Sequence, residues 1–317
     1  MWPDKTDGPA LRTHLRERLR LPLFVAPMFL ISGPDLIVAS ARAGALSAFP
    51  SVNARSPRDL DAWLDRLNAA AAEQPEAAPW GVNLIVHRSN ARLEEDLAAT
   101  VRARAPLVVA SVGAPDIVAG PVHDYGGLVF SDVASLRHAR KAVAAGADGL
   151  VLLTAGAGGN TGWLNPFAFI AETRRFFDGP IAVAGAIGSG RALHALEVLD
   201  ADLGYAGTPF IATHESLARP GHKDMVTRTD ADGVTLSDLV TGIPANFARE
   251  SLIAEGIIAP DGAPLHRGSL DVGSWKSVWS MGHGAGGVDD VRGTAERIDQ
   301  LLTEWRAARQ HMARPGS

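Results

Sequence analysis

One stretch of the chain places a single hydrogen-bonding side chain in a loop rich in glycine. An apolar run from Leu150 to Leu153 has the length and the β-forming residues of a strand that is buried on both faces. The loop after it can adopt positive φ angles or pass close to a flat ligand, because it contains Gly156, Gly158, Gly159 and Gly162. Asn160 projects from this loop. An amide can orient a ligand through hydrogen bonds, but it does not titrate and cannot remove a proton.

The composition excludes several classes of site and partner. The chain has 317 residues, of which 46% are hydrophobic, so it can bury a large core. Its formal net charge of -5 and pI near 6.1 predict no nucleic-acid or membrane-surface partner. Cysteine is absent, which excludes disulfides and thiol nucleophiles. The histidines lack metal-binding spacing, so no metal is predicted, and the absence of a signal peptide or a long apolar run predicts a cytoplasmic protein.

Strands and helices are expected to alternate along most of the chain. Helix starts are indicated at Ser56-Pro57 and Asn165-Pro166, where a capping side chain precedes a proline. Alternation with short connections requires parallel strands and right-handed crossovers, and this number of units predicts a closed TIM (β/α)8 barrel. The expected strands are Leu23 to Phe29, Ala45 to Ser51, Trp80 to Val86, Leu107 to Val112, Gly127 to Phe130, Gly149 to Leu153, Pro180 to Ala186 and Ala201 to Phe210.

The alternation stops after the eighth strand. Residues 212–278, which we call the mouth segment, have helix-capping signals and several glycines but no further strand pair. We therefore expect a helical excursion that covers the barrel mouth. A final amphipathic helix is expected from Asp289 to Arg309, packed on the barrel wall. The expected organisation is a barrel over 21–211, the mouth segment over 212–278, and a returning loop with a closing helix over 279–311.

Chemistry in a barrel of this kind takes place at the carboxyl ends of the strands. Positions after the seventh and eighth strands suit a phosphate, because their backbone N–H groups can face an anion and Thr208 adds a hydroxyl. Glycines there can also simply make turns, and Asn83 can also cap the turn after its strand. The strand-end residues are Ala26, Pro27, Met28, Asn83, Ser131, Asp132, Gly185, Ala186, Ile187, Gly188, Gly207 and Thr208.

With these positions in hand, the sequence resembles the nitronate monooxygenases, formerly called 2-nitropropane dioxygenases, which are flavin mononucleotide (FMN) enzymes on a TIM barrel. The likeness covers about residues 26–217 and 279–290, and the mouth segment matches only loosely. Six motifs carry it in family order: APM (26–28), GVN (81–83), AGADGLVLLTAGAGGNTG (145–162), AGAIGSGRAL (184–193), GYAGTPFIATHES (204–216) and WSMGHGAGGVDD (279–290).

The resemblance implies a role for each matching position. Pro27 and Met28 would lie beneath the isoalloxazine ring, and Asn83 would hydrogen-bond its polar edge. The phosphate would be held by Gly185, Ala186, Gly207 and Thr208. Gly282 and its neighbours would close over the flavin. The other expected cofactor contacts are Ala26, Ser131, Gly158, Gly159, Ile187 and Ser280.

One departure from the family concerns proton transfer. The family usually has a histidine where this chain has Asn160, acting as a base or as the partner of a nitro group. Asn160 is thus expected to orient substrate, unless its side chain only bonds its own backbone. Either the substrate arrives deprotonated, or another group removes the proton, or the reaction differs. His283 is the candidate replacement base, because its motif returns to the flavin face in the family, although a lone histidine is more often structural.

The expected function is the oxidation of alkyl nitronates, the anions of nitroalkanes, by O₂ on FMN. Two alternatives stay open: an NAD(P)H-dependent reductase of quinones or enoyl thioesters on the same barrel, and a barrel that binds a flavin or phosphate ligand without catalysis. The expected partners are a small-molecule substrate and O₂, with NAD(P)H and a homodimer as further alternatives.

Overall fold

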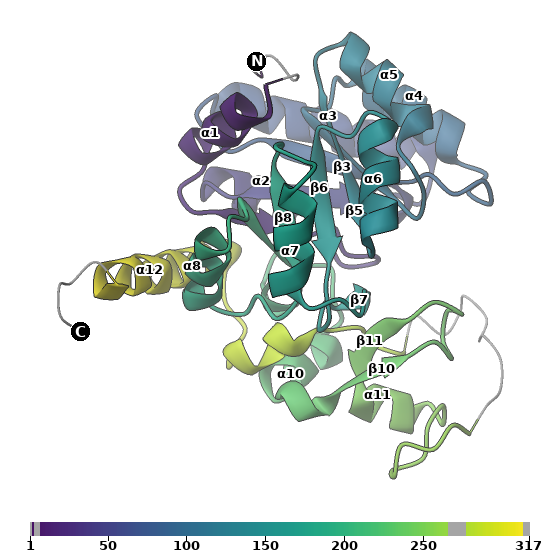
Figure 1. The fold of residues 1–317 in the computed structure, drawn as a ribbon. Coiled ribbons are helices and arrows are strands. Elements are labelled where there is room, and N and C mark those ends of the chain that lie inside the picture. The colour runs from purple at the N-terminus through teal and green to yellow at the C-terminus, as the bar shows by residue number, and fades with distance from the viewer. Residues whose placement is uncertain (1, 3–6, 266–276, 313–317) are drawn as a thin grey trace.

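A computed structural model describes residues 2, 7–265 and 277–312. Eight parallel strands close into a barrel in chain order (Figure 1), so the predicted TIM barrel is confirmed. The strands are β1 (Leu23–Val25), β2 (Leu46–Pro50), β3 (Trp80–Ile85), β4 (Leu107–Ser111), β5 (Leu128–Val133), β6 (Gly149–Leu153), β8 (Ile181–Ala184) and β9 (Leu203–Ala206).

Helices follow the barrel strands and pack on their outer faces. The two predicted helix starts are confirmed: Ser56 Oγ accepts from the N–H of Asp59, and the Asn165 side chain accepts from the N–H of Phe167. Among the described residues, no helix is long and apolar enough to cross a membrane. The outer helices are α2 (Pro34–Arg42), α3 (Pro57–Glu73), α4 (Leu93–Arg102), α5 (Asp116–Asp124), α6 (Leu136–Ala144), α7 (Pro166–Arg174), α8 (Gly190–Val198) and α12 (Thr294–Met312).

The eighth barrel strand is shorter than predicted. The apolar run Ala201 to Phe210 was expected to be one strand, but β9 ends at Ala206 and a short helix, α9 (Thr208–Ile211), follows Gly207. Pro209 lies in the first turn of α9, where a backbone N–H would have no partner within the helix, so a proline is tolerated. The chain thus turns at Gly207, which places both Gly207 and Thr208 at the carboxyl end of the barrel.

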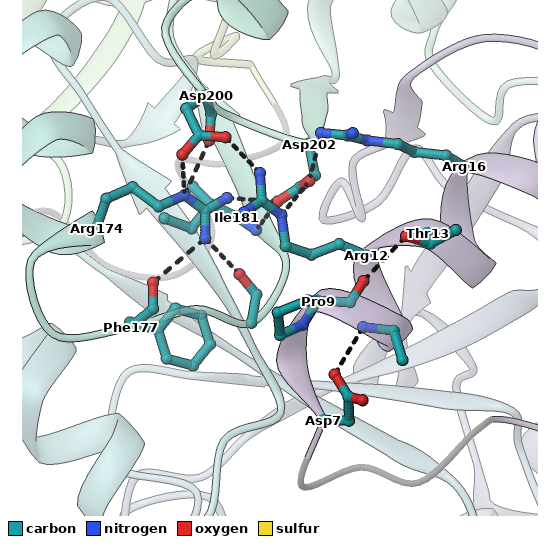
Figure 2. A network of polar contacts seen from close by, with 12 residues as sticks. Asp7, Pro9, Arg12, Thr13, Arg16, Arg174, Phe177, Ile181, Asp200 and Asp202 are labelled. Carbon is teal, nitrogen blue, oxygen red and sulfur yellow. Dashed lines mark hydrogen bonds and ion pairs between the residues drawn. The ribbon is translucent and has the colours of Figure 1, made fainter.

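The amino end of the barrel is closed by α1 (Gly8–Arg18), a helix that the sequence reading did not predict. Leu11 and Leu15 are fully buried in the cluster that fills this end of the barrel. The helix is also held by charge (Figure 2): the buried carboxylate of Asp202 accepts from Arg12 Nε at 2.8 Å, Arg16 Nη2 at 2.9 Å and Arg174 Nη2 at 2.5 Å. Figure 1 shows α1 at one end of the barrel and the mouth segment at the other.

The mouth segment contains a strand pair, so the prediction of a purely helical excursion was wrong. Besides α10 (Pro220–Thr227) and α11 (Arg249–Ala254), it forms β10 (Val234–Ser237) and β11 (Ala245–Ala248), which pair antiparallel. β11 also pairs with β7 (Gly159–Asn160), giving the sheet order β10-β11-β7. These strands are too short to show a period-2 pattern, and their sheet depends on residues far away in sequence. Residues 266–276 of the predicted excursion lie outside the described residues.

Candidate functional site

A cavity of about 420 Å³ opens at the carboxyl ends of the barrel strands. This volume is within the range of small-molecule sites in proteins, about 300–1,000 Å³. Most of the predicted site residues line it: Ala26, Pro27, Met28, Asn83, Gly158, Gly159, Asn160, Gly185, Ala186, Ile187, Gly207, Thr208, Ser280 and Gly282. The fold thus brings to one place residues that are up to 256 positions apart in the sequence (26 to 282).

Two predicted residues do not line the cavity. Ser131 is fully buried on β5, and its Oγ has no hydrogen-bond partner among the described residues. The strand was expected to end at Phe130 but continues to Val133, and successive side chains of a strand point to opposite faces. Its neighbour Asp132 therefore faces the cavity in its place.

His283, the candidate replacement base, is the second residue outside the cavity. It begins the 3-10 helix η4 (His283–Gly287), and its side chain is exposed. Its backbone N–H donates to Gly156 O at 3.0 Å, and its ring lies against Gly156. Its neighbours Gly282 and Gly284 line the cavity instead. The geometry therefore gives His283 a contact with the glycine loop and no direct access to a bound ligand.

Asn83 is held by the adjacent strand and does not cap a turn. Its Nδ2 donates to Val109 O at 3.0 Å and to Ser111 Oγ at 2.6 Å, both on β4. Because Nδ2 faces a carbonyl oxygen, the orientation of the amide is fixed. Its Oδ1 accepts no hydrogen bond within the described part of the chain. Asn83 therefore offers a fixed acceptor at the cavity wall.

Asp132 is the functional candidate that the sequence reading left unassigned. Its carboxyl lines the cavity, and burial raises its pKa to about 6, although hydrogen bonds from Ser111 and from the N–H of Val112 lower it in part. Tyr205 also lines the cavity; burial and the Asp132 charge raise its pKa well above the ordinary value, so the phenol stays neutral. The signal for Asp132 was a carboxylate inside an apolar strand, which predicts either a partner or a function.

Asn160 lies at the rim of the cavity on the short strand β7. Its backbone pairs with Ala245 of β11, so the mouth segment holds it in place. The side chain is exposed and makes no hydrogen bond to its own backbone or to any other described residue. The alternative of a purely loop-forming asparagine thus has no contact to support it, and the free amide is available to a ligand.

The end of the cavity near β8 and β9 has free backbone donors. Gly185, with φ +139°, and Ala186, with φ +56°, make a turn there, and a Cβ on Gly185 would lie 2.2 Å from Thr154 Oγ1. The N–H groups of Gly185, Ala186 and Gly207 find no acceptor among the described residues. The hydroxyl of Thr208 accepts from the N–H of Gly282 at 2.9 Å and so joins this end to the returning loop (residues 279–287).

The returning loop packs on the glycine loop backbone against backbone. A Cβ on Gly158 would lie 2.7 Å from the nitrogen of Gly282, and a Cβ on Gly282 would lie 2.6 Å from the nitrogen of Gly158. Real Cβ atoms do not come so close, so both positions need glycine for this contact. The glycine loop was expected to adopt positive φ angles or to pass close to a flat ligand; Gly158 and Gly282 in addition approach each other.

These residues fit a flavin. The ring edge alternates hydrogen-bond acceptors with an N–H donor, which matches the Asn83 acceptor and the Asp132 carboxyl in the same cavity. The unpaired N–H groups at Gly185, Ala186 and Gly207 suit a phosphate. Most of the remaining lining is apolar, as a ring system requires.

Known proteins resemble this chain over most of its length. A curated relative from Mycobacterium tuberculosis, named (3aS,4S,5R,7aS)-5-hydroxy-7a-methyl-1-oxo-octahydro-1H-indene-4-carboxyl-CoA dehydrogenase, is 25% identical over 77% of this chain and 68% of its own. FabK from Thermotoga maritima has a TM-score of 0.77 at 24% identity, over 95% of this chain and 97% of its own. A nitroalkane oxidase from Streptomyces ansochromogenes has a TM-score of 0.79 at 22% identity, over 94% and 99%. The last two likenesses establish the fold.

The family is established by a direct match. The family model described as nitronate monooxygenase matches residues 13–265. Members of this family are oxidoreductases that use a flavin, so the chain is an enzyme of this class and the non-catalytic alternative is set aside. The chain belongs to the nitronate monooxygenase family.

Proposed function

We propose that this enzyme binds FMN across the barrel mouth and oxidises alkyl nitronates with O₂. The bound flavin would accept the electrons of the substrate and pass them to O₂. The ring edge would meet Asn83 and Asp132, and the phosphate would meet the N–H groups at Gly185, Ala186 and Gly207. The substrate would lie between the ring and the rim, where Asn160 donates a hydrogen bond to it.

The observation that carries this proposal is the free amide of Asn160 at the rim. It can donate to an oxygen of a nitronate, but it cannot take a proton from carbon. His283, which the sequence suggested as a replacement base, does not line the cavity. A substrate that is already an anion needs no proton removal, so a preformed nitronate is the substrate that suits this rim.

A reductase of quinones or enoyl thioesters is the second candidate. Two observations favour it. Phe29 and Val112 line the cavity, and each residue is 38% exposed. In addition, the curated relative is named as a dehydrogenase of a carboxyl-CoA compound. An apolar rim of this kind suits an uncharged, extended substrate. This enzyme would take electrons from NADH or NADPH before reducing its substrate.

Two measurements distinguish these functions. The cofactor released by denaturing the purified protein should chromatograph as FMN, and anaerobic mixing with propionate 3-nitronate should bleach the bound flavin, whereas NADH or NADPH should not. In air, O₂ uptake should follow nitronate concentration. Bleaching by NADH or NADPH without any by nitronates would replace the first function with the second. Absence of flavin from protein that rebinds none would contradict both.

A further inference from the structure

The described residues that line the cavity include one carboxyl group and no cation to neutralise it. Among the described residues that line it, the ionisable side chains are Asp132 and Tyr205, and no lysine, arginine or histidine is present. Tyr205, on β9, is the titratable group that senses the charge of Asp132. An unpaired buried carboxylate is unfavourable, so this carboxyl gains stability by holding a proton.

A chain of hydrogen bonds across the adjacent strands β3, β4 and β5 limits where a proton on Asp132 can point. Ser111 Oγ accepts from Asn83 Nδ2 at 2.6 Å, so the single Ser111 hydroxyl proton is available to Asp132, to which Ser111 is hydrogen-bonded. The N–H of Val112 lies 3.4 Å from Asp132 Oδ1. Val112 N–H can only donate to Asp132, and one of the two acceptor positions of Ser111 Oγ is already used by Asn83. The cavity is therefore an open direction for a proton on the carboxyl.

The two ends of this chain present opposite polarity to a ligand. Asn83, on β3, offers the acceptor Oδ1, and a protonated Asp132, on β5, offers an O–H donor on the other side of Ser111. The pyrimidine edge of a flavin carries an N–H flanked by acceptor atoms, so it can satisfy both groups at once. Burial raises the pKa of Asp132 to about 6, so the proton is readily held near neutral pH when a ligand accepts a hydrogen bond from it.

We propose that Asp132 binds the flavin ring as a carboxylic acid, donating to an acceptor of the pyrimidine edge while Asn83 Oδ1 accepts the ring N–H. This inference rests on the proposed function, because it requires a flavin in the cavity. It adds that flavin binding takes up a proton. It also explains how a cavity with a carboxyl group accepts an anionic substrate: the carboxyl is neutral once the ring is bound.

The proton uptake has a measurable sign. If the protonated form binds the ring, binding above the pKa of the free protein requires a proton from solvent. The dissociation constant should then rise with pH from about 6, by up to roughly tenfold per pH unit, until the pKa of the complex is reached. Asp132→Asn keeps an N–H donor at every pH and should show no such rise. Asp132→Ala should bind weakly throughout.

The test uses the flavin-stripped protein and quenching of flavin fluorescence between pH 5.5 and 8.5. The phosphate of FMN itself titrates near pH 6, so riboflavin, which lacks it, is measured in parallel. Asp124→Asn, which removes an exposed carboxylate on α5, is the matched control and should follow the unmodified protein. When riboflavin is mixed with the unmodified protein in weak buffer at pH 7.5, close to a single proton should be taken up per bound riboflavin. With Asp132→Asn no proton should be taken up.

The outcomes separate the two proposals. Parallel pH profiles for the unmodified protein and Asp132→Asn, or equal proton uptake by both, would overturn the role of Asp132 while leaving the flavin site intact. So would Asp132→Ala binding as tightly as the unmodified protein at pH 5.5. If neither flavin binds to any variant at any pH, the proposed function fails and this inference fails with it.

Discussion

The imidazole of His222 lies stacked on the indole of Trp279, with ring centroids 5.4 Å apart and the planes inclined by 8°. Nε2 of the same histidine is 3.1 Å from Ser280 O, so its N–H donates to that carbonyl. These contacts join α10 to the returning loop, where Ser280 and Gly282 line the cavity. Burial lowers the pKa of His222 to about 4, opposed in part by the bond to Ser280.

The first prediction follows from this lowered pKa. Between about pH 4 and 6.5 the unfolded chain protonates this histidine and the folded protein does not, so folding stability falls as the pH falls through that window. The full effect is roughly 3 kcal/mol. His222→Gln retains an N–H donor but cannot titrate, so urea unfolding of the flavin-free variant should lose this part of the pH dependence. The prediction is contradicted if the unfolding free energy changes between pH 4.5 and 7 by the same amount in His222→Gln as in the unmodified protein.

Asp132 should oppose His222 over nearly the same pH range, which gives a second prediction. Its pKa is raised from 3.8 to about 6, so the folded protein holds a proton that the unfolded chain has lost. Its contribution to stability is therefore present at low pH and is lost as the pH rises from about 4 to 6. In flavin-free Asp132→Asn this opposition is removed. The acid destabilisation caused by His222 should then be steeper than in the unmodified protein, as measured by urea unfolding at several pH values.

The third prediction concerns the ion pairs that hold α1 on the barrel. Asp202→Ala leaves the guanidinium groups of Arg12 and Arg174 without their buried partner, and breaking such a buried pair costs about 3–5 kcal/mol. Asp200 bonds the same two arginines, but its side chain is 60% exposed, so Asp200→Ala is the matched control and should cost at most about 1 kcal/mol. Chemical denaturation measures both. Equal destabilisation by the two variants would show that burial of Asp202 is not what matters.

Much of this architecture was predictable from the sequence because long, repeated patterns encode it. The barrel strands are continuous apolar runs, and the starts of α3 and α7 are marked by Ser56-Pro57 and Asn165-Pro166. The sheet β10-β11-β7 is not encoded by such a pattern. Its strand β7 has only two residues, and it pairs with β11, about 85 residues later in the chain, as the pairing of Asn160 with Ala245 shows. The helix α1 was hidden because arginines flank Leu11 and Leu15, and only the tertiary fold buries these two leucines.

The sequence predicted which strand ends form the site, but it did not predict at every strand end which side chain faces the cavity. The motifs placed Asn83, Gly185 and Gly207 correctly at the cavity, because strand ends of a barrel meet there. Asp132 was missed in favour of Ser131 because a small error in where β5 ends changes which side chain faces inward. No sequence pattern records that Ser111 and Val112 hydrogen-bond Asp132 or that Ser111 is in turn held by Asn83, since this chain of contacts joins three different strands.

The fourth prediction tests the phosphate end of the cavity. A Cβ on Gly207 would meet the flexible thioether of Met28 at 3.2 Å, so the fold can accept a side chain there, while the side chain would cover the free N–H groups nearby. Gly207→Val should weaken FMN binding roughly 10- to 100-fold through lost hydrogen bonds to the charged phosphate, and should weaken riboflavin binding less. Gly120→Val, where the added group meets nothing within 4 Å, is the control. If purified Gly207→Val retains its full FMN content, the phosphate does not bind at this end of the cavity.

The last prediction concerns Asn160, whose free amide is held at the rim by β11. If the substrate arrives as a nitronate, Asn160 only orients an anion, and losing one hydrogen bond costs about 0.5–1.5 kcal/mol. Asn160→Ala should therefore lose roughly 2- to 10-fold in kcat/KM for nitronates, and the unmodified enzyme should turn over neutral nitroalkanes far more slowly than nitronates. General-base catalysis typically contributes ~10²–10⁴-fold, and the described residues of this rim do not include such a base.

Replacing the amide with an imidazole should supply that base. Asn160→His should gain nitroalkane turnover, and the gain should appear as the pH rises through the pKa of the new histidine, because only the neutral imidazole accepts a proton. Asn68→His, which adds a histidine to the exposed surface of α3, should not gain it. Oxygen uptake with matched nitroalkane and nitronate concentrations measures both activities. Equal turnover of the two forms by the unmodified enzyme would show that a base already reaches the substrate, and Asp132, the carboxyl in the cavity, would then be the group to replace.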